Sequence, residues 1–195
     1  MRLVLLIGLL LAGLGSAHAQ TGIAVYGDST ARGDGAQTEW YDRLQEILPR
    51  QRPIHSAGIN RNSISGLVKS VEADTEHRDW TVVFYDRRNA GESAEEWMEQ
   101  IAAAIALLQT DRFLIMPQVP VSGGREDGLT LPVLLEINEL VRATYPDNSF
   151  DADTEAEFLA RLDDDATRAD RIHRNDAGQQ IEAEFIGAWL NERGW

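Results

Sequence analysis

The chain has 195 residues, with 32 acidic and 18 basic side chains, no cysteine, and a net charge of −14 at pH 7. A surface this negative repels nucleic acids and anionic lipid headgroups, so binding to either is not expected. The absence of cysteine excludes a disulfide scaffold and thiolate chemistry, and the length suits one domain with its own core.

The first residues predict an export signal. Met1 and Arg2 give a positive start, an apolar stretch of about twelve residues follows, and residues 17–19 supply the small-x-small pattern that a signal peptidase cleaves. A membrane anchor is the alternative, but a spanning helix needs about 20 apolar residues. We therefore expect a signal peptide over residues 1–19, one mature domain over residues 20–195, and a periplasmic or secreted protein without stable membrane insertion.

The predicted mature chain opens with a short apolar run that stops at Gly27-Asp28-Ser29. Such a run is typical of a buried strand ended by turn residues, and a loop at a strand end can hold a reactive side chain rigidly. Gly, Asp and Ser are also common turn formers, so the triplet alone does not identify a nucleophile. Ser29 is a candidate that needs a base and an oxyanion site elsewhere.

Strand-like and helix-like segments then alternate. Further strands are predicted at residues 53–58, 80–85 and 112–116, with a short fifth strand at residues 148–150. Helices are predicted at residues 38–48, 62–73, 93–109, 131–145 and 177–191. Ser93 and Glu96 form a capping-box pattern, and Asp176 with Gln179 is expected to cap the last helix. This alternation predicts a parallel sheet between two layers of helices.

Two loops could be mistaken for ligand sites. The glycine-rich segment at residues 122–125 has no Gly-Lys-Ser/Thr sequence after it, so a phosphate-binding P-loop is not expected. The acidic segment at residues 151–165 lacks the glycine and the ligand spacing of an EF-hand. A solvated loop and a short helix are expected there instead.

In parallel sheets, ligands bind beyond the carboxyl ends of the strands. Three predicted loops lie at that edge, carrying Ser29, Gly58 and Asn89, and a fourth segment with Asp170 and His173 leads into the last helix. A serine hydroxyl needs a neutral imidazole to take its proton and a carboxylate to orient that imidazole. His173 and Asp170, three residues apart, can supply both, while the backbone amides of Ser29 and Gly58 and the Asn89 amide can bind an oxyanion.

Other roles for these residues stay open. Asp170 could pair only with a neighbouring arginine, and Gly58 and Asn89 could be simple turn residues. Asp28, Asp170 and His173 could also be zinc ligands, but no close pair of histidines and no His-Glu-x-x-His run accompanies them in the sequence. No metal and no cofactor is therefore expected.

Four blocks in order resemble the SGNH hydrolases, also called the GDSL esterase/lipase family. They are Gly27-Asp28-Ser29-Thr30, Gly58, Asn89, and Asp170-x-x-His173 with the residues that follow it. The resemblance implies a flavodoxin-like three-layer α/β/α sandwich with a parallel sheet of about five strands. It also implies that Ser29 is the nucleophile, His173 the base and Asp170 its orienting acid, with Ser29, Gly58 and Asn89 forming the oxyanion hole.

The third block departs from the family pattern Gly-x-Asn-Asp, because this chain has Arg87-Arg88-Asn89-Ala90 there. Arginine adopts some glycine backbone angles only at a cost, so the loop could run differently. Arg87 and Arg88 are also candidates for substrate binding, since a guanidinium can hold a carboxylate or phosphate in two hydrogen bonds. The alternative is that both point outward and pair with acidic residues.

These observations predict an exported serine esterase that hydrolyses a carboxylic ester of a carbohydrate or lipid, with a short acyl or acetyl group. One alternative is a non-catalytic domain that binds envelope glycan in the same cleft, and the altered third block favours it. Acyl transfer to a sugar hydroxyl is another, because it uses identical residues. The expected partner is a small ester substrate, and the sequence leaves the oligomeric state open.

Overall fold

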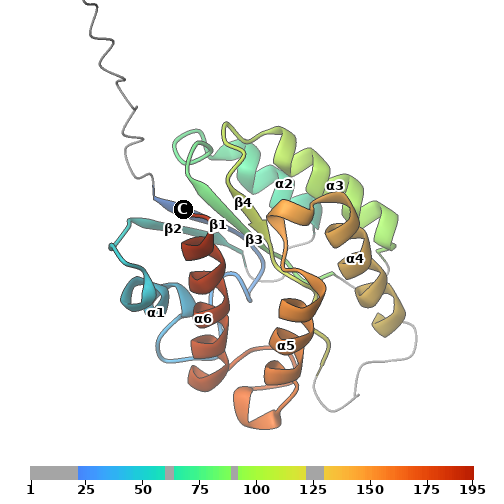
Figure 1. Cartoon of the computed structure of the whole chain (residues 1–195). Helices are drawn as coiled ribbons and strands as arrows, with labels where there is room; N and C mark the ends of the chain where they lie inside the picture. The colour runs from blue at the N-terminus through green and yellow to red at the C-terminus, as the bar shows by residue number, and fades with distance from the viewer. Residues whose placement is uncertain (1–21, 60–63, 89–91, 122–129) are drawn as a thin grey trace, which may run out of the picture.

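The computed structural model describes residues 22–59, 64–88, 92–121 and 130–195, and it shows a parallel sheet between two layers of helices (Figure 1). The strands are β1 (Ile23–Gly27), β2 (Ile54–Gly58), β3 (Thr81–Tyr85) and β4 (Phe113–Ile115). They lie in the order β2-β1-β3-β4, and all neighbours run parallel, so their carboxyl ends meet at one edge. The predicted flavodoxin-like three-layer fold is confirmed, with four strands in the sheet.

The predicted fifth strand is wrong. Pro146–Asn148 forms a 3₁₀ helix, η2, and the chain then turns away from the sheet. The Asn148 side chain donates a hydrogen bond of 2.8 Å to the carbonyl of Phe113 in β4, and the Ser149 hydroxyl donates one of 2.9 Å to the carbonyl of Tyr145. Phe150 packs edge-on against Phe158, with ring centroids 5.4 Å apart. Side-chain hydrogen bonds and core packing therefore replace a strand ladder here.

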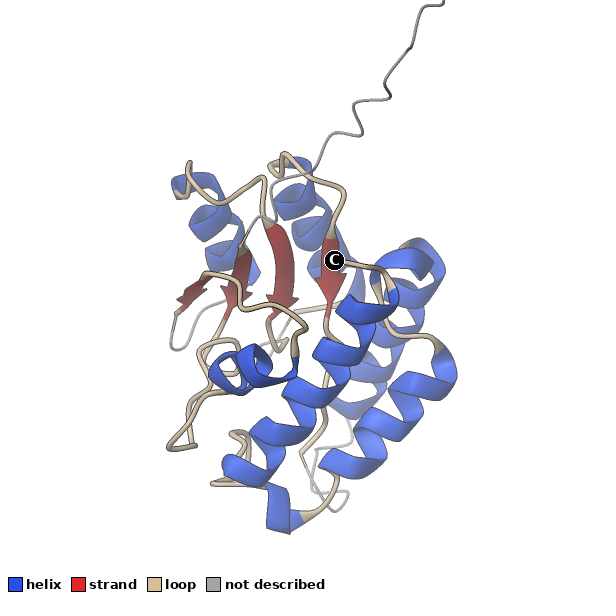
Figure 2. Ribbon diagram, turned by 60° about the vertical axis from the view of Figure 1, so that its left-hand side comes forward, coloured by secondary structure: helices blue, strands red, loops and turns tan. Residues whose placement is uncertain are grey.

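β1, β3 and β4 are buried on both faces, each face under its own group of helices (Figure 2), whereas the edge strand β2 is only partly buried. Ile23 and Val25 of β1 join one core, while Ala24 and Tyr26 join the other. The first core is covered by α1 (Trp40–Ile47), α5 (Ala152–Leu162) and α6 (Asp176–Glu192). The second is covered by α2 (Ile64–Ala73), α3 (Ala94–Ala106) and α4 (Thr130–Thr144). Burial on both sides explains why the strands are apolar without alternation.

Two predicted helix starts have different outcomes. The capping box at α3 is confirmed, since the Ser93 hydroxyl accepts from the Glu96 amide at 3.1 Å and the Glu96 carboxylate accepts from the Ser93 amide at 2.9 Å. At α6 the predicted cap is wrong, because the N-cap is Asn175 and Asp176 is the first helical residue. The Asp176 carboxylate instead accepts from the backbone amide of Thr38, ahead of α1.

The acidic segment is more ordered than expected. Asp151 caps α5, and Phe158 and Leu162 of that helix are buried. Within the described parts of the chain, no helix is both long and apolar enough to cross a membrane. The predicted signal peptide lies outside the described residues.

Candidate active site

Ser29 lies in the turn that follows β1, and the neighbouring carboxylate fixes that turn. One oxygen of Asp28 accepts from the Thr30 amide at 2.8 Å and from the Thr30 hydroxyl at 2.5 Å, and the other accepts from the Arg87 amide at 3.3 Å. Burial raises the pKa of Asp28, and these hydrogen bonds oppose the shift. Asp28 thereby joins the turn after β1 to the loop after β3. The Ser29 residue is only 8% exposed.

The structure brings Ser29, His173 and Asp170 together in one chain of hydrogen bonds. His173 Nε2 lies 2.9 Å from the hydroxyl oxygen of Ser29, and its Nδ1 lies 2.7 Å from a carboxylate oxygen of Asp170. The other Asp170 oxygen accepts from the backbone amides of Ile172 and His173, at 2.7 and 2.8 Å. Partial burial acts to raise the pKa of Asp170, but its hydrogen bonds to His173 and Ile172 lower it to about 2. The carboxylate is therefore ionised at neutral pH.

The loop that carries His173 is a narrow hairpin, and Gly35 packs against it. Arg168 and Arg174 form an antiparallel bridge, and the Ala169 amide donates to the His173 carbonyl at 3.0 Å. Gly35, with a φ of +103°, packs under this hairpin, since a Cβ there would lie 2.8 Å from the Cβ of His173. Only glycine combines that backbone angle with so close an approach.

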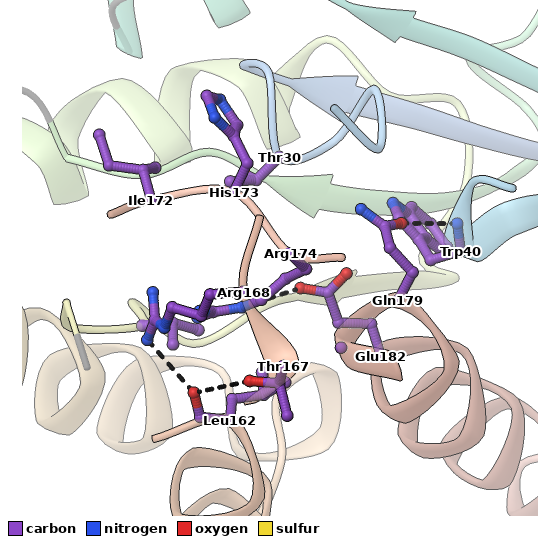
Figure 3. Close-up of polar contacts among 12 residues, drawn as sticks. Thr30, Trp40, Leu162, Thr167, Arg168, Ile172, His173, Arg174, Gln179 and Glu182 are labelled. Carbon is purple, nitrogen blue, oxygen red and sulfur yellow. Dashed lines mark hydrogen bonds and ion pairs between the residues drawn. The ribbon is translucent and has the colours of Figure 1, made fainter. Parts of the chain in front are cut away.

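Behind the hairpin, a buried polar cluster anchors the residue after the histidine. His173 and Arg174 point away from each other, and Arg174 reaches toward Glu182 of α6 (Figure 3). Arg174 Nε lies 3.7 Å from Glu182 Oε1, which also accepts a hydrogen bond of 2.6 Å from the Tyr85 hydroxyl. Burial raises the pKa of Glu182 to about 7, although Arg174, the Tyr85 hydroxyl and Arg168 lower it.

Sequence reasoning missed this cluster. Arginine and glutamate in and beside a helix usually lie on the surface, and neither side chain showed a pattern that predicts burial. The one available signal was Tyr85, a strand residue whose hydroxyl needs a partner when it is buried.

Gly58 ends β2 directly beside the turn that carries Ser29. A Cβ at this position would lie 2.7 Å from the Arg32 amide nitrogen and 2.8 Å from the Asp28 carbonyl oxygen, so a side chain would displace the turn. The Ile59 amide donates to Gly27 of β1. Asn89, the third expected oxyanion donor, lies outside the described residues.

The two expected substrate-binding arginines differ in their surroundings. Arg88 is 8% exposed, and its Nε donates a hydrogen bond of 2.5 Å to the Glu92 carbonyl. Its amide donates to the Gln118 side chain at 2.7 Å, so we assign Arg88 to holding the loop rather than to substrate. Arg87 is partly exposed, and its Nε lies 3.5 Å from the Val119 carbonyl oxygen. Together with Thr30 and Ile172, Arg87 and Val119 line a small depression.

An apolar cavity of about 300 Å³ opens close by, between α5 and the segment after β4. Its walls include Val119, Val121, Leu131 and Leu159. Val119 lines both this cavity and the depression with Thr30, so the two spaces are neighbours. Ser29, Asp170 and His173 are not among the residues that line either space, but Thr30 and Ile172, each next in sequence to one of them, line the depression.

Comparison with known proteins identifies the fold. The sequence matches no family model, and no curated protein matches it significantly. The lipase/acylhydrolase from Enterococcus faecalis matches with a TM-score of 0.72 at 15% identity, over 89% of this chain and 96% of that one. A member of the lipolytic protein G-D-S-L family from Veillonella parvula gives 0.67 at 20% identity, over 85% and 96%. An acetylxylan esterase from Geobacillus stearothermophilus gives 0.63 at 17% identity, over 90% and 94%. The chain therefore has the SGNH hydrolase fold.

Proposed function

We propose that this protein is a serine esterase of the SGNH type, which cleaves a carboxylic ester through an acyl-enzyme. The observation that carries the proposal is the unbroken contact from the Ser29 hydroxyl through both ring nitrogens of His173 to Asp170. These groups come from opposite ends of the folded chain, since Ser29 and His173 are 144 positions apart in the sequence. The contact among these three side chains, on a fold shared with lipolytic enzymes, supports a catalytic role for Ser29 rather than a purely structural role in the turn.

In the proposed reaction, His173 Nε2 takes the proton of Ser29 as the hydroxyl oxygen attacks the ester carbonyl. The C–O bond to the alcohol then breaks, and His173 returns the proton to the leaving oxygen. Water, activated by the same imidazole, attacks the acyl-enzyme and releases the carboxylic acid and free Ser29. Asp170 stays ionised throughout, accepts a hydrogen bond from Nδ1–H, and stabilises the imidazolium.

The negative charge on the tetrahedral intermediate needs preorganised donors. The Gly58 amide is assigned to this role because Gly58 lies beside the Ser29 turn. We assign the Ser29 amide and the Asn89 side chain to the same oxyanion hole, as the family resemblance implies. Removing one such donor costs about 10²–10³ in kcat in a well-studied protease.

The proposed substrate is an ester of a carbohydrate or lipid with a short acyl group, met outside the cytoplasm after cleavage behind Ala19. The apolar cavity of about 300 Å³ near the depression supports a small apolar acyl group. The acetylxylan esterase among the structural neighbours supports a carbohydrate ester. N-terminal sequencing of the exported protein should begin at Gln20, and an uncleaved exported chain would refute that part of the proposal.

The direct test is hydrolysis of p-nitrophenyl esters of increasing acyl length by the mature chain. Wild type should turn over the short esters, and Ser29→Ala should reduce kcat by about 10³-fold or more at an unchanged circular dichroism spectrum. Ser65→Ala is the matched control, since Ser65 is exposed on α2, and it should keep wild-type rates.

Absence of turnover by wild type, with retained glycan binding, would favour the non-catalytic alternative. Adding a sugar acceptor and measuring ester against free acid distinguishes acyl transfer from hydrolysis.

Arg87 is proposed to contact an anionic group near the ester, because its side chain borders the depression beside Thr30. Arg87→Ala should lower kcat/KM for an ester with a free carboxylate by about tenfold more than for a neutral ester of equal size. Equal effects on the two esters would remove this contact from the proposal.

A further inference from the structure

A second cluster of titratable side chains lies at the edge of the sheet, away from the Ser29–His173 pair. His55 comes from β2, and Asp74 and His77 come from the connection between α2 and β3. His55 Nε2 lies 3.2 Å from Oδ2 of Asp74, and His77 Nδ1 lies 2.9 Å from the same oxygen. One ligand atom from each residue fits within 4.8 Å of the others.

No spacing in the sequence predicts this cluster, because the two histidines lie 22 positions apart along the chain. In the fold, however, the two imidazole rings stack with centroids 3.9 Å apart and an interplanar angle of 8°. The sequence analysis found no close pair of histidines along the chain, whereas the fold places His55 and His77 side by side.

The Asp74 carboxylate, which contacts a nitrogen of each ring, is held in place by other donors. The Tyr26 hydroxyl donates to Asp74 Oδ2 at 2.8 Å, and the backbone amides of Glu76 and His77 donate to Oδ1 at 2.9 and 3.1 Å. Burial acts to raise the pKa of Asp74, but these hydrogen bonds and that of His77 lower it to about 2. Such partners orient a metal-binding carboxylate and keep it ionised.

The cluster is open to ions on one side. The side chains of His55, His77 and Asp74 are 36%, 19% and 10% exposed. A cavity of about 450 Å³ is lined by His55 and Asp74, together with Ala57, Thr75 and Glu76. His55 is partly exposed on an edge strand, so its ring can turn out of the stack. One nitrogen of His55 and one of His77 can then face the same ion. The cavity leaves room for water as a further ligand.

We propose that His55, Asp74 and His77 bind a divalent transition-metal ion, with Zn²⁺ as the best-suited ion. Two imidazole nitrogens and one carboxylate oxygen form a ligand set typical of zinc, and the cavity supplies an open coordination position. Each histidine would bind the ion as a neutral imidazole through the nitrogen that now faces Asp74, with its hydrogen on the other ring nitrogen.

A bound ion would secure the edge of the sheet. Among the described strands β2 pairs only with β1, so the His55 side of the sheet lacks a further strand. The ion would tie β2 to the α2–β3 connection, a role that disulfides cannot fill in a chain without cysteine. This inference does not depend on the proposed esterase activity.

Calorimetric titration of ZnCl₂ into the metal-free mature chain at pH 7.5 tests the site. One ion per chain should bind. His55→Ala and His77→Ala should each weaken binding by about 10- to 100-fold or more. His173→Ala is the matched control, because Asp170-x-x-His173 is the same local motif elsewhere, and it should keep wild-type affinity.

Thermal unfolding gives an independent readout. Zn²⁺ at about 100 times its dissociation constant should raise Tm of wild type and His173→Ala by on the order of 5 °C, and should not raise that of His55→Ala. Co²⁺ should give visible absorption bands that disappear in His77→Ala. Absence of stoichiometric Zn²⁺ binding, or its loss in His173→Ala with retention in His55→Ala, would overturn the proposal.

Discussion

At the scale of single residues, the chain contains the same local motif twice. In Asp170-x-x-His173 and in Asp74-x-x-His77, one carboxylate oxygen accepts two backbone amides and the other contacts Nδ1 of the histidine. The spacing alone therefore determines the Asp–His contact, which is why it could be predicted from the sequence. What lies across from each pair differs, since Ser29 meets His173 whereas the ring of His55 stacks on His77. That difference depends on the tertiary fold.

Replacing Asp170 with asparagine tests the orienting role of the carboxylate. Asp170→Asn keeps the side-chain size and an oxygen for the backbone amides, but its amide no longer stabilises the imidazolium or selects the productive tautomer. We expect kcat for p-nitrophenyl acetate to fall by roughly 10²- to 10⁴-fold with little change in KM. The lower part of that range is favoured because the Asp170 side chain is 57% exposed to solvent.

The control for this variant is Asp153→Asn, which removes an equal charge from an exposed position in the first turn of α5. It should keep the wild-type kcat. If both variants turn over substrate at the wild-type rate, the carboxylate of Asp170 is a backbone cap without a role in catalysis.

At the scale of secondary-structure elements, features that depend on neighbouring residues in the sequence were predicted well. Contacts between different elements were not predicted. The apolar runs of β1 and β3 and the Ser93 capping box follow from nearest neighbours, and the structure agrees with them. The wrong cap at Asp176 has a tertiary cause, because that carboxylate is used by the segment before α1. Gln179, expected to complete the cap, instead accepts from the Trp40 amide at 2.7 Å. Such partners are not visible in a single sequence.

Asn175 links the start of α6 to the hairpin that carries His173, and two substitutions separate its contacts. Its side-chain oxygen accepts from the amides of Ala177 and Gly178, and its Nδ2 donates to the carbonyls of Ala166 and Arg168. Asn175→Ala removes both functions and should lower the free energy of unfolding in urea by about 2 kcal/mol. Asn175→Asp keeps the cap acceptor and should recover about half of that loss. Equal losses in both variants would mean that the cap contributes nothing.

At the scale of the whole molecule, the composition predicted one acidic domain but not where its buried charges lie. A net charge of −14 indicates a solvated acidic surface, yet Arg174 and Glu182 are 3% and 1% exposed. They meet because β3, the His173 hairpin and α6 converge, and no spacing in the sequence encodes that convergence. The proposed roles of Ser29, Asp170 and His173 could be predicted from the chemistry of these residues and from the resemblance of the blocks to a known family. The supporting cluster has no such motif.

The buried carboxylate should make the stability of the whole domain depend on pH. The pKa of Glu182 is about 7 in the folded protein, against an ordinary value of 4.5, so between these values the folded state holds a proton that the unfolded state has lost. The free energy of unfolding should therefore decrease as pH rises from 4.5 to 7 and level off above pH 7.

Glu182→Gln, which cannot ionise, should lack this contribution, so its stability relative to wild type should rise over the same window by an amount on the order of a few kcal/mol. Urea unfolding at pH 5 and pH 8 measures both slopes, with Glu157→Gln on the exposed face of α5 as the control that should follow wild type. A constant difference between Glu182→Gln and wild type would show that Arg174 fully compensates the burial of the charge, and a falling difference would show that the ion pair outweighs it.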